Sequence, residues 1–166
     1  MPSKSAWQIA DGPTWLVARH LATSSELALR TWRAERLVRR SDCVAQARLA
    51  RPSIPELHDE AVVERRPFTT PADFDTELVV GVEPSTQGVS GYAIAIGARV
   101  GSCYAAVFTT RVEGNGAEQE VAMRLGVVVD RILASVRLRS VDDRAVRHRI
   151  VVTPAGAPSR PPGPDE

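Results

Sequence analysis

The chain contains 166 residues, 43 % of them hydrophobic and 25 % charged, which indicates one globular domain with a sizeable core and excludes disorder over most of its length. The formal net charge is +1, so no overall field would draw the protein to nucleic acid or to an anionic membrane. The charge is nevertheless uneven, because residues 1–40 carry 7 basic and 3 acidic side chains whereas residues 41–90 carry 4 and 9.

The first half of the chain predicts two strands, a short helix and a third strand. Residues 14–34, "TWLVARHLATSSELALRTWRA", form a hairpin in this prediction, because Trp, Val, Leu and Thr favour strands on either side of "ATSSE". A helix is predicted over residues 41–50, where "SD" can cap the first turn and prolines at positions 52 and 55 end it. A short strand is expected at 61–65.

The next segment predicts a strand and a longer hairpin. "TELVVGVEP" (76–84) is a compact apolar strand, and its final proline should end it. Residues 91–114 form a hairpin with "GARVG" as the turn. Within "GYAIAIG" the tyrosine and isoleucines alternate with alanines, so the large side chains fall on one face and the small ones on the other. The small side chains would let a helix approach the sheet closely.

The last part of the chain predicts one long helix, an edge strand and a tail. Val, Leu and Ile recur with helical spacing over residues 117–136. "VRHRIVV" (146–152) is expected to be an edge strand, and the five prolines of "TPAGAPSRPPGPDE" predict a disordered tail over 153–166. No apolar run reaches the ~18 residues of a membrane-spanning helix, so we expect no transmembrane segment.

These elements predict a single α+β domain over residues 1–152, with helices packed on a mostly antiparallel sheet as an α-β-α sandwich. In element order, the chain resembles the DcrB/PsbP-like α-β-α sandwich family. The likeness is carried by the "WLVARH…LALRTW" hairpin, the "SDCVAQARLA" helix, the strands of 76–112 and the closing helix that ends "ILASVRL". The resemblance implies binding of proteins or hydrophobic segments without catalysis. It carries over no functional residue, because the family offers no motif to match position by position.

One loop invites comparison with phosphate-binding loops. "RVEGNGAEQEVAMRL" (111–125) places Gly-Asn-Gly between a strand and a helix, where backbone amides and the helix dipole could meet an anion. The third glycine of a G-x-G-x-x-G loop would fall at Gln119, and Glu118 and Glu120 bring two carboxylates that would repel a phosphate. We interpret Asn115-Gly116 as a positive-φ turn that joins strand to helix.

The expected redox state of the two cysteines depends on the cellular compartment. Cys43 and Cys103 stand 60 residues apart and lack the grouping of a zinc site. If Met1 is the native start, the protein is cytoplasmic and both thiols should be reduced; if a leader was removed, it is periplasmic or a lipoprotein and a Cys43–Cys103 disulfide is possible. No histidine base can be named beside Cys43, and the three histidines are scattered. We therefore expect no catalytic residue, no metal site and no cofactor.

"RTWRAERLVRR" (30–40) carries five arginines against one glutamate. It could stack on and neutralise a nucleic acid with the help of Trp32, form a solvated face whose arginine stems cover apolar surface, or bind an acidic protein partner. Because the net charge is close to zero and no other nucleic-acid-binding signature occurs, we expect no nucleic-acid partner. The tryptophans of the first hairpin either pack in the core or form an aromatic groove for an apolar segment. The predicted partner-binding residues are Trp15, Trp32, Arg30, Arg33, Arg36, Arg39 and Arg40.

The sequence is compatible with three classes of function. The first is a non-catalytic, chaperone- or adaptor-like domain that binds another protein, for example a secreted effector or part of a secretion machinery. The second is a periplasmic lipoprotein body with a structural disulfide. The third is a small enzyme, which would need polar groups that converge in a pocket, and the sequence offers no paired carboxylates, nucleophile elbow or metal-ligand spacing.

Overall fold

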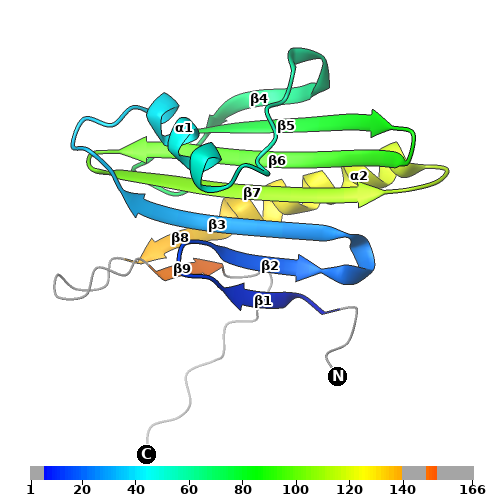
Figure 1. The fold of residues 1–166 in the computed structure, drawn as a ribbon, viewed down its shortest axis with the longest axis horizontal. Helices are drawn as coiled ribbons and strands as arrows, with labels where there is room; N and C mark the ends of the chain where they lie inside the picture. Colours follow the sequence, from blue (N-terminus) through cyan, green and yellow to red (C-terminus); the bar gives the residue numbers. More distant parts are fainter. Residues whose placement is uncertain (1–5, 140–148, 153–166) are drawn as a thin grey trace, which may run out of the picture.

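The computed structural model describes residues 6–139 and 149–152, and its centre is a seven-stranded antiparallel sheet (Figure 1). The strand order across the sheet is β1-β2-β3-β7-β6-β5-β4. The chain therefore builds one half of the sheet from β1 to β3 and the other from β4 to β7. The bounds are β1 (Gln8–Asp11), β2 (Leu16–His20), β3 (Ser25–Arg33), β4 (Val62–Phe68), β5 (Asp75–Ser85), β6 (Gly88–Arg99) and β7 (Ser102–Val112).

Two helices lie on opposite faces of this sheet (Figure 1). α1 (Arg40–Ala50) packs on β6 and β7 from one side, and α2 (Ala117–Val127) packs on β5, β6 and β7 from the other. α2 continues through a π-helical turn and a 3-10 turn, which lead into a hairpin of two short strands that pair only with each other in the described part of the chain. The remaining elements are η1 (Leu21–Thr23), η2 (Asp59–Ala61), η3 (Val128–Ile132), η4 (Leu133–Ser135), β8 (Val136–Arg139) and β9 (Arg149–Val152).

The α2 face carries the larger hydrophobic core. Val121, Leu125 and Leu133 pack against alanines of β6 and β7 and against leucines of β3 and β5. A Cβ atom added at Gly91 would overlap Val121 Cγ1 and come within 3.1 Å of Leu125 Cδ1. The small residues of β6 therefore bring the helix close to the sheet, as the sequence predicts.

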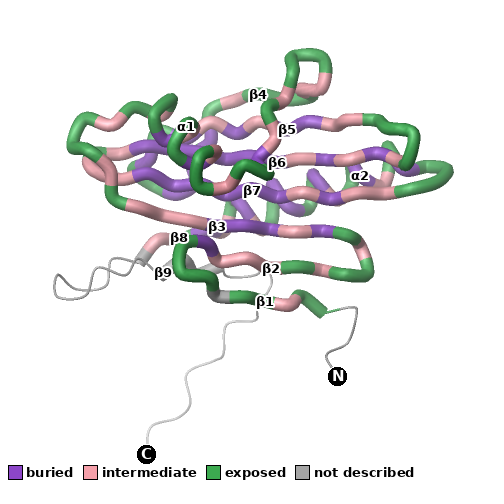
Figure 2. Tube along the Cα trace, in the orientation of Figure 1, coloured by how far each residue is buried: buried purple, intermediate pink, exposed green. Residues whose placement is uncertain are grey.

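The α1 face carries a smaller core that is pinned by a covalent bond. Cys43 of α1 and Cys103 of β7 form a disulfide, and both residues are fully buried. Ile94 and Ile96 of β6 pack beside them, together with Ala47 of α1. α1 is short and covers only part of this face, so burial is densest in the central strands and falls toward both edges of the sheet (Figure 2).

The α+β class and the mostly antiparallel sheet are confirmed, and several element boundaries differ from the predictions. β4 continues to Phe68, and β5 runs through Pro84 to Ser85. Pro84 does not end β5 because β4 reaches β5 only as far as Gly81, which leaves the outer side of Pro84 without a ladder partner. The turn between β6 and β7 consists of Val100 and Gly101 alone, since "GAR" still pairs within the sheet.

The end of the chain also differs. The predicted single helix over 117–136 is interrupted by the π-helical turn, and its last residue opens β8. The expected edge strand at 146–152 is observed as β9 over Arg149–Val152, and it pairs with β8 instead of joining the main sheet. The predicted tail over 153–166 lies outside the described residues.

The two outermost strands of the main sheet are unlike the inner ones. β4 contains Pro67, three charged side chains and a register shift between Val62 and Glu64. β1, at the other edge of the sheet, has four residues.

The helices in the described part of the chain do not have the length and apolar character that a membrane-spanning helix requires.

Candidate functional site

The strongest candidate site is a cleft of about 380 Å³ at one end of the sheet, which we call the arginine cleft. The loop between β3 and α1 lies there beside the β6–β7 turn (Figure 1). Two backbone hydrogen bonds fix this arrangement, from Ala34 N to Gly101 O (3.0 Å) and from Gly101 N to Arg36 O (3.3 Å). The cleft is lined by Arg36, Leu37, Val38, Arg39, Arg40, Asp75, Ala98, Arg99 and Val100.

The start of α1 sets the direction of two of these arginines. Arg39 occupies the N-cap position, and its backbone amide donates to Asp42 Oδ2 at 3.0 Å. The helix therefore begins at Arg40, and Asp42 caps it from inside the first turn instead of preceding the helix as predicted. This places both Arg39 and Arg40 in the lining of the cleft.

The cleft has an excess of positive charge. Arg40 Nη1 lies 2.8 Å from Asp75 Oδ1, and Arg40 Nη2 lies 3.6 Å from Glu77 Oε2. Arg36, Arg39 and Arg99 form no ion pair with any carboxylate in the described part of the chain. The guanidinium of Arg99 lies 4.7 Å from the centroid of the Phe74 ring, a cation–π contact that brings no negative charge. An incoming carboxylate would meet three guanidinium groups, those of Arg36, Arg39 and Arg99, that have no carboxylate partner among the described residues.

Apolar side chains stand among these arginines. Leu37 is 87 % exposed and Val100 is 74 % exposed, one in each of the two segments that form the cleft. A partner that combines acidic and apolar side chains would suit this surface. Its carboxylates could bind the guanidinium groups, and its apolar side chains could pack against Leu37 and Val100.

A second cavity of about 210 Å³ adjoins the cleft beneath α1, and we call it the anchor pocket. Arg40 lines both cavities. Glu77 lies between two arginines that line the pocket. Its carboxylate accepts a hydrogen bond from Arg65 Nη1 at 3.0 Å and forms an ion pair with Arg40. The pocket is lined by Arg40, Val44, Arg48, Ile54, Pro55, Leu57, Arg65, Glu77, Val79, Ile94 and Ile96.

The structure places Trp15, Arg30 and Trp32 apart from both cavities. The Arg30 guanidinium lies 5.8 Å from the centroid of the Trp15 ring and 4.9 Å from that of Trp32, and burial lowers the pKa of Arg30. The guanidinium of Arg51 lies 5.6 Å from the Trp15 centroid. Trp15 is buried, and Trp32 donates from Nε1 to Gln46 Oε1 of α1 at 2.7 Å. Trp15, Arg30 and Trp32 therefore form a stack that supports α1.

Of the seven predicted partner-binding residues, the structure brings three together at the cleft: Arg36, Arg39 and Arg40. Arg33 is exposed at the end of β3 and lines neither cavity. The cleft also contains Asp75 and Arg99, which come from strands far along the chain and are not among the predicted partner-binding residues. The local sequence indicates only that Arg99 lies in the predicted "GARVG" turn.

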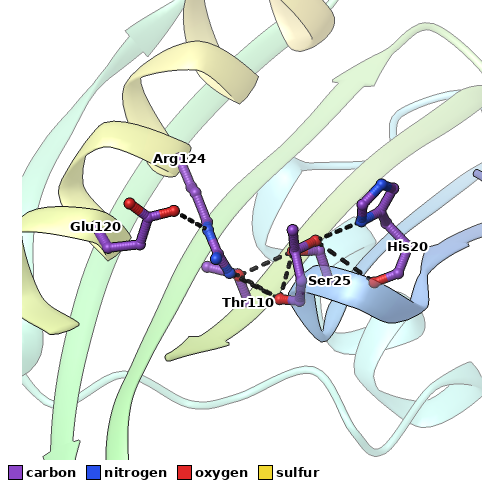
Figure 3. Close-up of polar contacts among 6 residues, drawn as sticks. His20, Ser25, Thr110, Glu120 and Arg124 are labelled. Carbon is purple, nitrogen blue, oxygen red and sulfur yellow. Dashed lines mark hydrogen bonds and ion pairs between the residues drawn. The ribbon is translucent and has the colours of Figure 1, made fainter. Parts of the chain in front are cut away.

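A polar network on the other side of the molecule is the main competitor as a site (Figure 3). Arg124 of α2 donates to Thr23 O at 2.7 Å and to Thr110 Oγ1 at 3.0 Å, and Glu120 accepts from Arg124 Nε at 2.9 Å. Ser25 and Thr110 share a hydrogen bond of 2.9 Å and are both buried. Every group here bonds to a neighbour, so the network ties the turn after β2 to β7 and α2. We assign it a structural role.

The Gly-Asn-Gly segment has the geometry of a turn. Gly114 and Gly116 have φ values of +89° and +77°, and Gly116 is the N-cap of α2. The left-handed residues are thus the two glycines, not Asn115. Glu118 and Glu120 lie in the first turn of the helix, where a phosphate would meet their negative charge.

The histidines and cysteines of the described residues form neither a metal-binding cluster nor a free thiol. The described residues contain no group of three or more His, Cys, Asp or Glu side chains that could hold a metal ion. Cys43 is bonded to Cys103 and is therefore not a thiol nucleophile in this structure. His20 Nδ1 lies 2.8 Å from Thr23 Oγ1, within the polar network, and His148 lies outside the described residues.

Comparison with known proteins does not assign the chain to a family. No protein-family model matches the chain, and no curated protein matches it. The resemblance to DcrB/PsbP-like proteins stays a prediction from element order.

Proposed function

We propose that this protein is a non-catalytic, adaptor- or chaperone-like domain that binds an acidic segment of another protein in the arginine cleft. The observation that supports it is the set of three cleft arginines, Arg36, Arg39 and Arg99, that have no carboxylate partner among the described residues. The helices on opposite faces of the sheet also suit the proposed DcrB/PsbP-like α-β-α sandwich, whose known members bind proteins.

Electrostatics sets the character of this interaction. Charge-assisted hydrogen bonds between guanidinium and carboxylate groups are about twice as strong as neutral ones, and the fork of an arginine can hold a carboxylate in two bonds. The cleft is open to solvent, so salt screens it; the Debye length is about 8 Å at physiological ionic strength. We therefore expect affinity to fall as salt is added.

The test uses a fluorescein-labelled peptide with the sequence EDEDLDEDE, and fluorescence anisotropy measures its dissociation constant. Exchanging Arg36→Glu and Arg39→Glu together should weaken binding by at least tenfold, because two attractive charges become repulsive. The matched control is Arg131→Glu with Arg137→Glu, which makes the same change of charge at two exposed positions outside the cleft. Equal weakening by both pairs would show only a net-charge effect and would contradict the proposal.

A single-stranded DNA oligonucleotide of the same net charge serves as competitor. Phosphates and carboxylates both attract arginine, so a protein that reads acidic side chains should prefer the peptide. If the oligonucleotide binds more tightly than the peptide, the cleft is a nucleic-acid site and the proposal is wrong.

We also propose that the protein works in an oxidising compartment. The Cys43–Cys103 disulfide supports this, because such bonds persist outside the reducing cytosol. Titration of free thiols under denaturing conditions, on protein from its native host compartment, should find neither cysteine free. Two free thiols would contradict the proposal and would favour the cytoplasm.

A further inference from the structure

We infer that the anchor pocket receives one large apolar side chain of the acidic segment, so the recognised motif is an aliphatic or aromatic residue flanked by acidic residues. This inference rests on the proposed function and adds to it the chemistry of the partner. It predicts that charge alone does not specify the partner.

The walls of the pocket are suited to a side chain. Ile94 and Ile96 of β6 form part of its lining, while Val44, Leu57 and Val79 are half-buried and still offer apolar surface to an incoming group. At about 210 Å³, the pocket is larger than the ~150 Å³ engineered cavity that binds benzene. It therefore has room for a leucine or phenylalanine side chain.

The position of Arg40 links the pocket to the cleft. Arg40 lines both cavities, so a segment whose apolar side chain enters the pocket brings its neighbouring carboxylates near Arg40 and the cleft arginines. Arg40 is already paired with Asp75 and Glu77, which holds it in place between the cavities. Charge complementarity thus favours an acidic partner over a neutral apolar one.

Arg48 adds a further cation at the pocket. It lines the pocket, its side chain is 38 % exposed, and its Nη1 lies 3.6 Å from Oε1 of the exposed Glu56. A carboxylate of the bound segment can therefore approach the partly exposed Arg48 side chain and form a charge-assisted hydrogen bond.

The first test changes only the ligand. The peptide EDEDLDEDE is compared with EDEDGDEDE by fluorescence anisotropy on the full chain. Burial of a leucine side chain should tighten binding by about tenfold or more. Equal affinity of the two peptides would overturn the anchor pocket and leave the proposed function standing, whereas binding of neither peptide would overturn both.

The second test fills the pocket from α1. Val44→Trp should abolish the advantage of the leucine peptide, because the indole occupies the space. Leu49→Trp on the same helix is the control, since Leu49 is 85 % exposed and does not line the pocket. A leucine advantage that survives in a folded Val44→Trp variant would overturn the inference. Circular dichroism checks that both variants fold, and the peptide comparison above decides the matter if Val44→Trp does not.

A third measurement tests a different occupant. Octanoate carries a carboxylate and an apolar chain without a peptide, and it should not compete with EDEDLDEDE below millimolar concentration. Competition at micromolar concentration would assign the pocket to a small apolar carboxylate and would overturn the inference.

Discussion

The two faces of the central sheet are built by different means. On the α2 face, a long helical segment lies on small residues of β6 and β7 and buries one continuous core. On the α1 face, an eleven-residue helix is held by a disulfide and by stacked arginine and tryptophan side chains, and it covers only part of the strands. The α2 face thus supplies stability, while the α1 face keeps charged and apolar groups available. Both cavities of the candidate site lie on or beside α1.

The greatest loss of stability is expected from a change on the α2 face. Val121→Asp places a charge at a position with 0 % exposure, and we expect it to unfold the domain or cost more than about 4 kcal/mol. Val127→Asp on the same helix is the control, because Val127 is 48 % exposed and should cost less than about 1 kcal/mol. Thermal melting followed by circular dichroism measures both, and similar melting temperatures would show that α2 does not pack as described.

The next effect concerns the covalent bond of the α1 face. Cys43→Ala with Cys103→Ala opens a loop of 60 residues, and chain entropy predicts a loss of about 4 kcal/mol. Urea unfolding with and without dithiothreitol should show the same loss for the native protein. Hydrogen exchange should then quicken in α1 more than in α2. An unfolding midpoint that does not respond to the reductant would mean that the bond does not form.

A smaller effect on stability, opposite in sign at the two positions, is expected when Gly91 and Gly126 are exchanged for alanine. Gly91→Ala should destabilise the domain by about 1–3 kcal/mol, because the new methyl group collides with Val121 and Leu125. Gly126→Ala on the exposed side of α2 meets no atom within 4 Å and should stabilise it by roughly 0.5–1 kcal/mol. Chemical denaturation distinguishes the two, and effects of the same sign would refute the close approach of α2.

The weakest of these effects concerns the stack on the α1 face. Arg30→Gln removes a guanidinium that lies over two tryptophan rings, and we expect a loss of about 1 kcal/mol. Arg33→Gln, three residues further along β3, is exposed and should change stability by less than about 0.5 kcal/mol. Equal changes in the denaturation midpoint would show that the stack contributes nothing.

Much of the fold is predictable because side-chain alternation in a strand is local information. The pattern in "GYAIAIG" assigns Ile94 and Ile96 to one face and Ala93 and Ala95 to the other, and the two cores contain them as expected. The presence of Pro84 inside β5 cannot be predicted from the neighbouring residues. A proline fits there only because β4, the adjacent strand, has already ended. The π-helical turn likewise has no signal in the spacing of apolar residues.

The candidate site is predictable only in part for the same reason. Arg36, Arg39 and Arg40 lie close in sequence and could be recognised as a cluster. Arg99 joins them because β6 and β7 return the chain to the same end of the sheet, and this pairing depends on the whole strand register. Arg30 belongs to the same sequence run but points its charge at Trp15 and Trp32, since strand geometry and not sequence proximity decides its face.

The outer strands determine how extended chains can approach the protein. An exposed sheet edge normally offers a ladder of free amides and carbonyls to any neighbouring strand. Pro67 removes one donor from β4, its neighbouring charges disfavour an apolar companion, and β1 is too short to template a long pairing. The edges of the sheet therefore disfavour the addition of strands from other molecules, which would build a fibril. A polypeptide that binds this protein is expected to contact side chains on a face of the sheet and not the backbone of an edge strand.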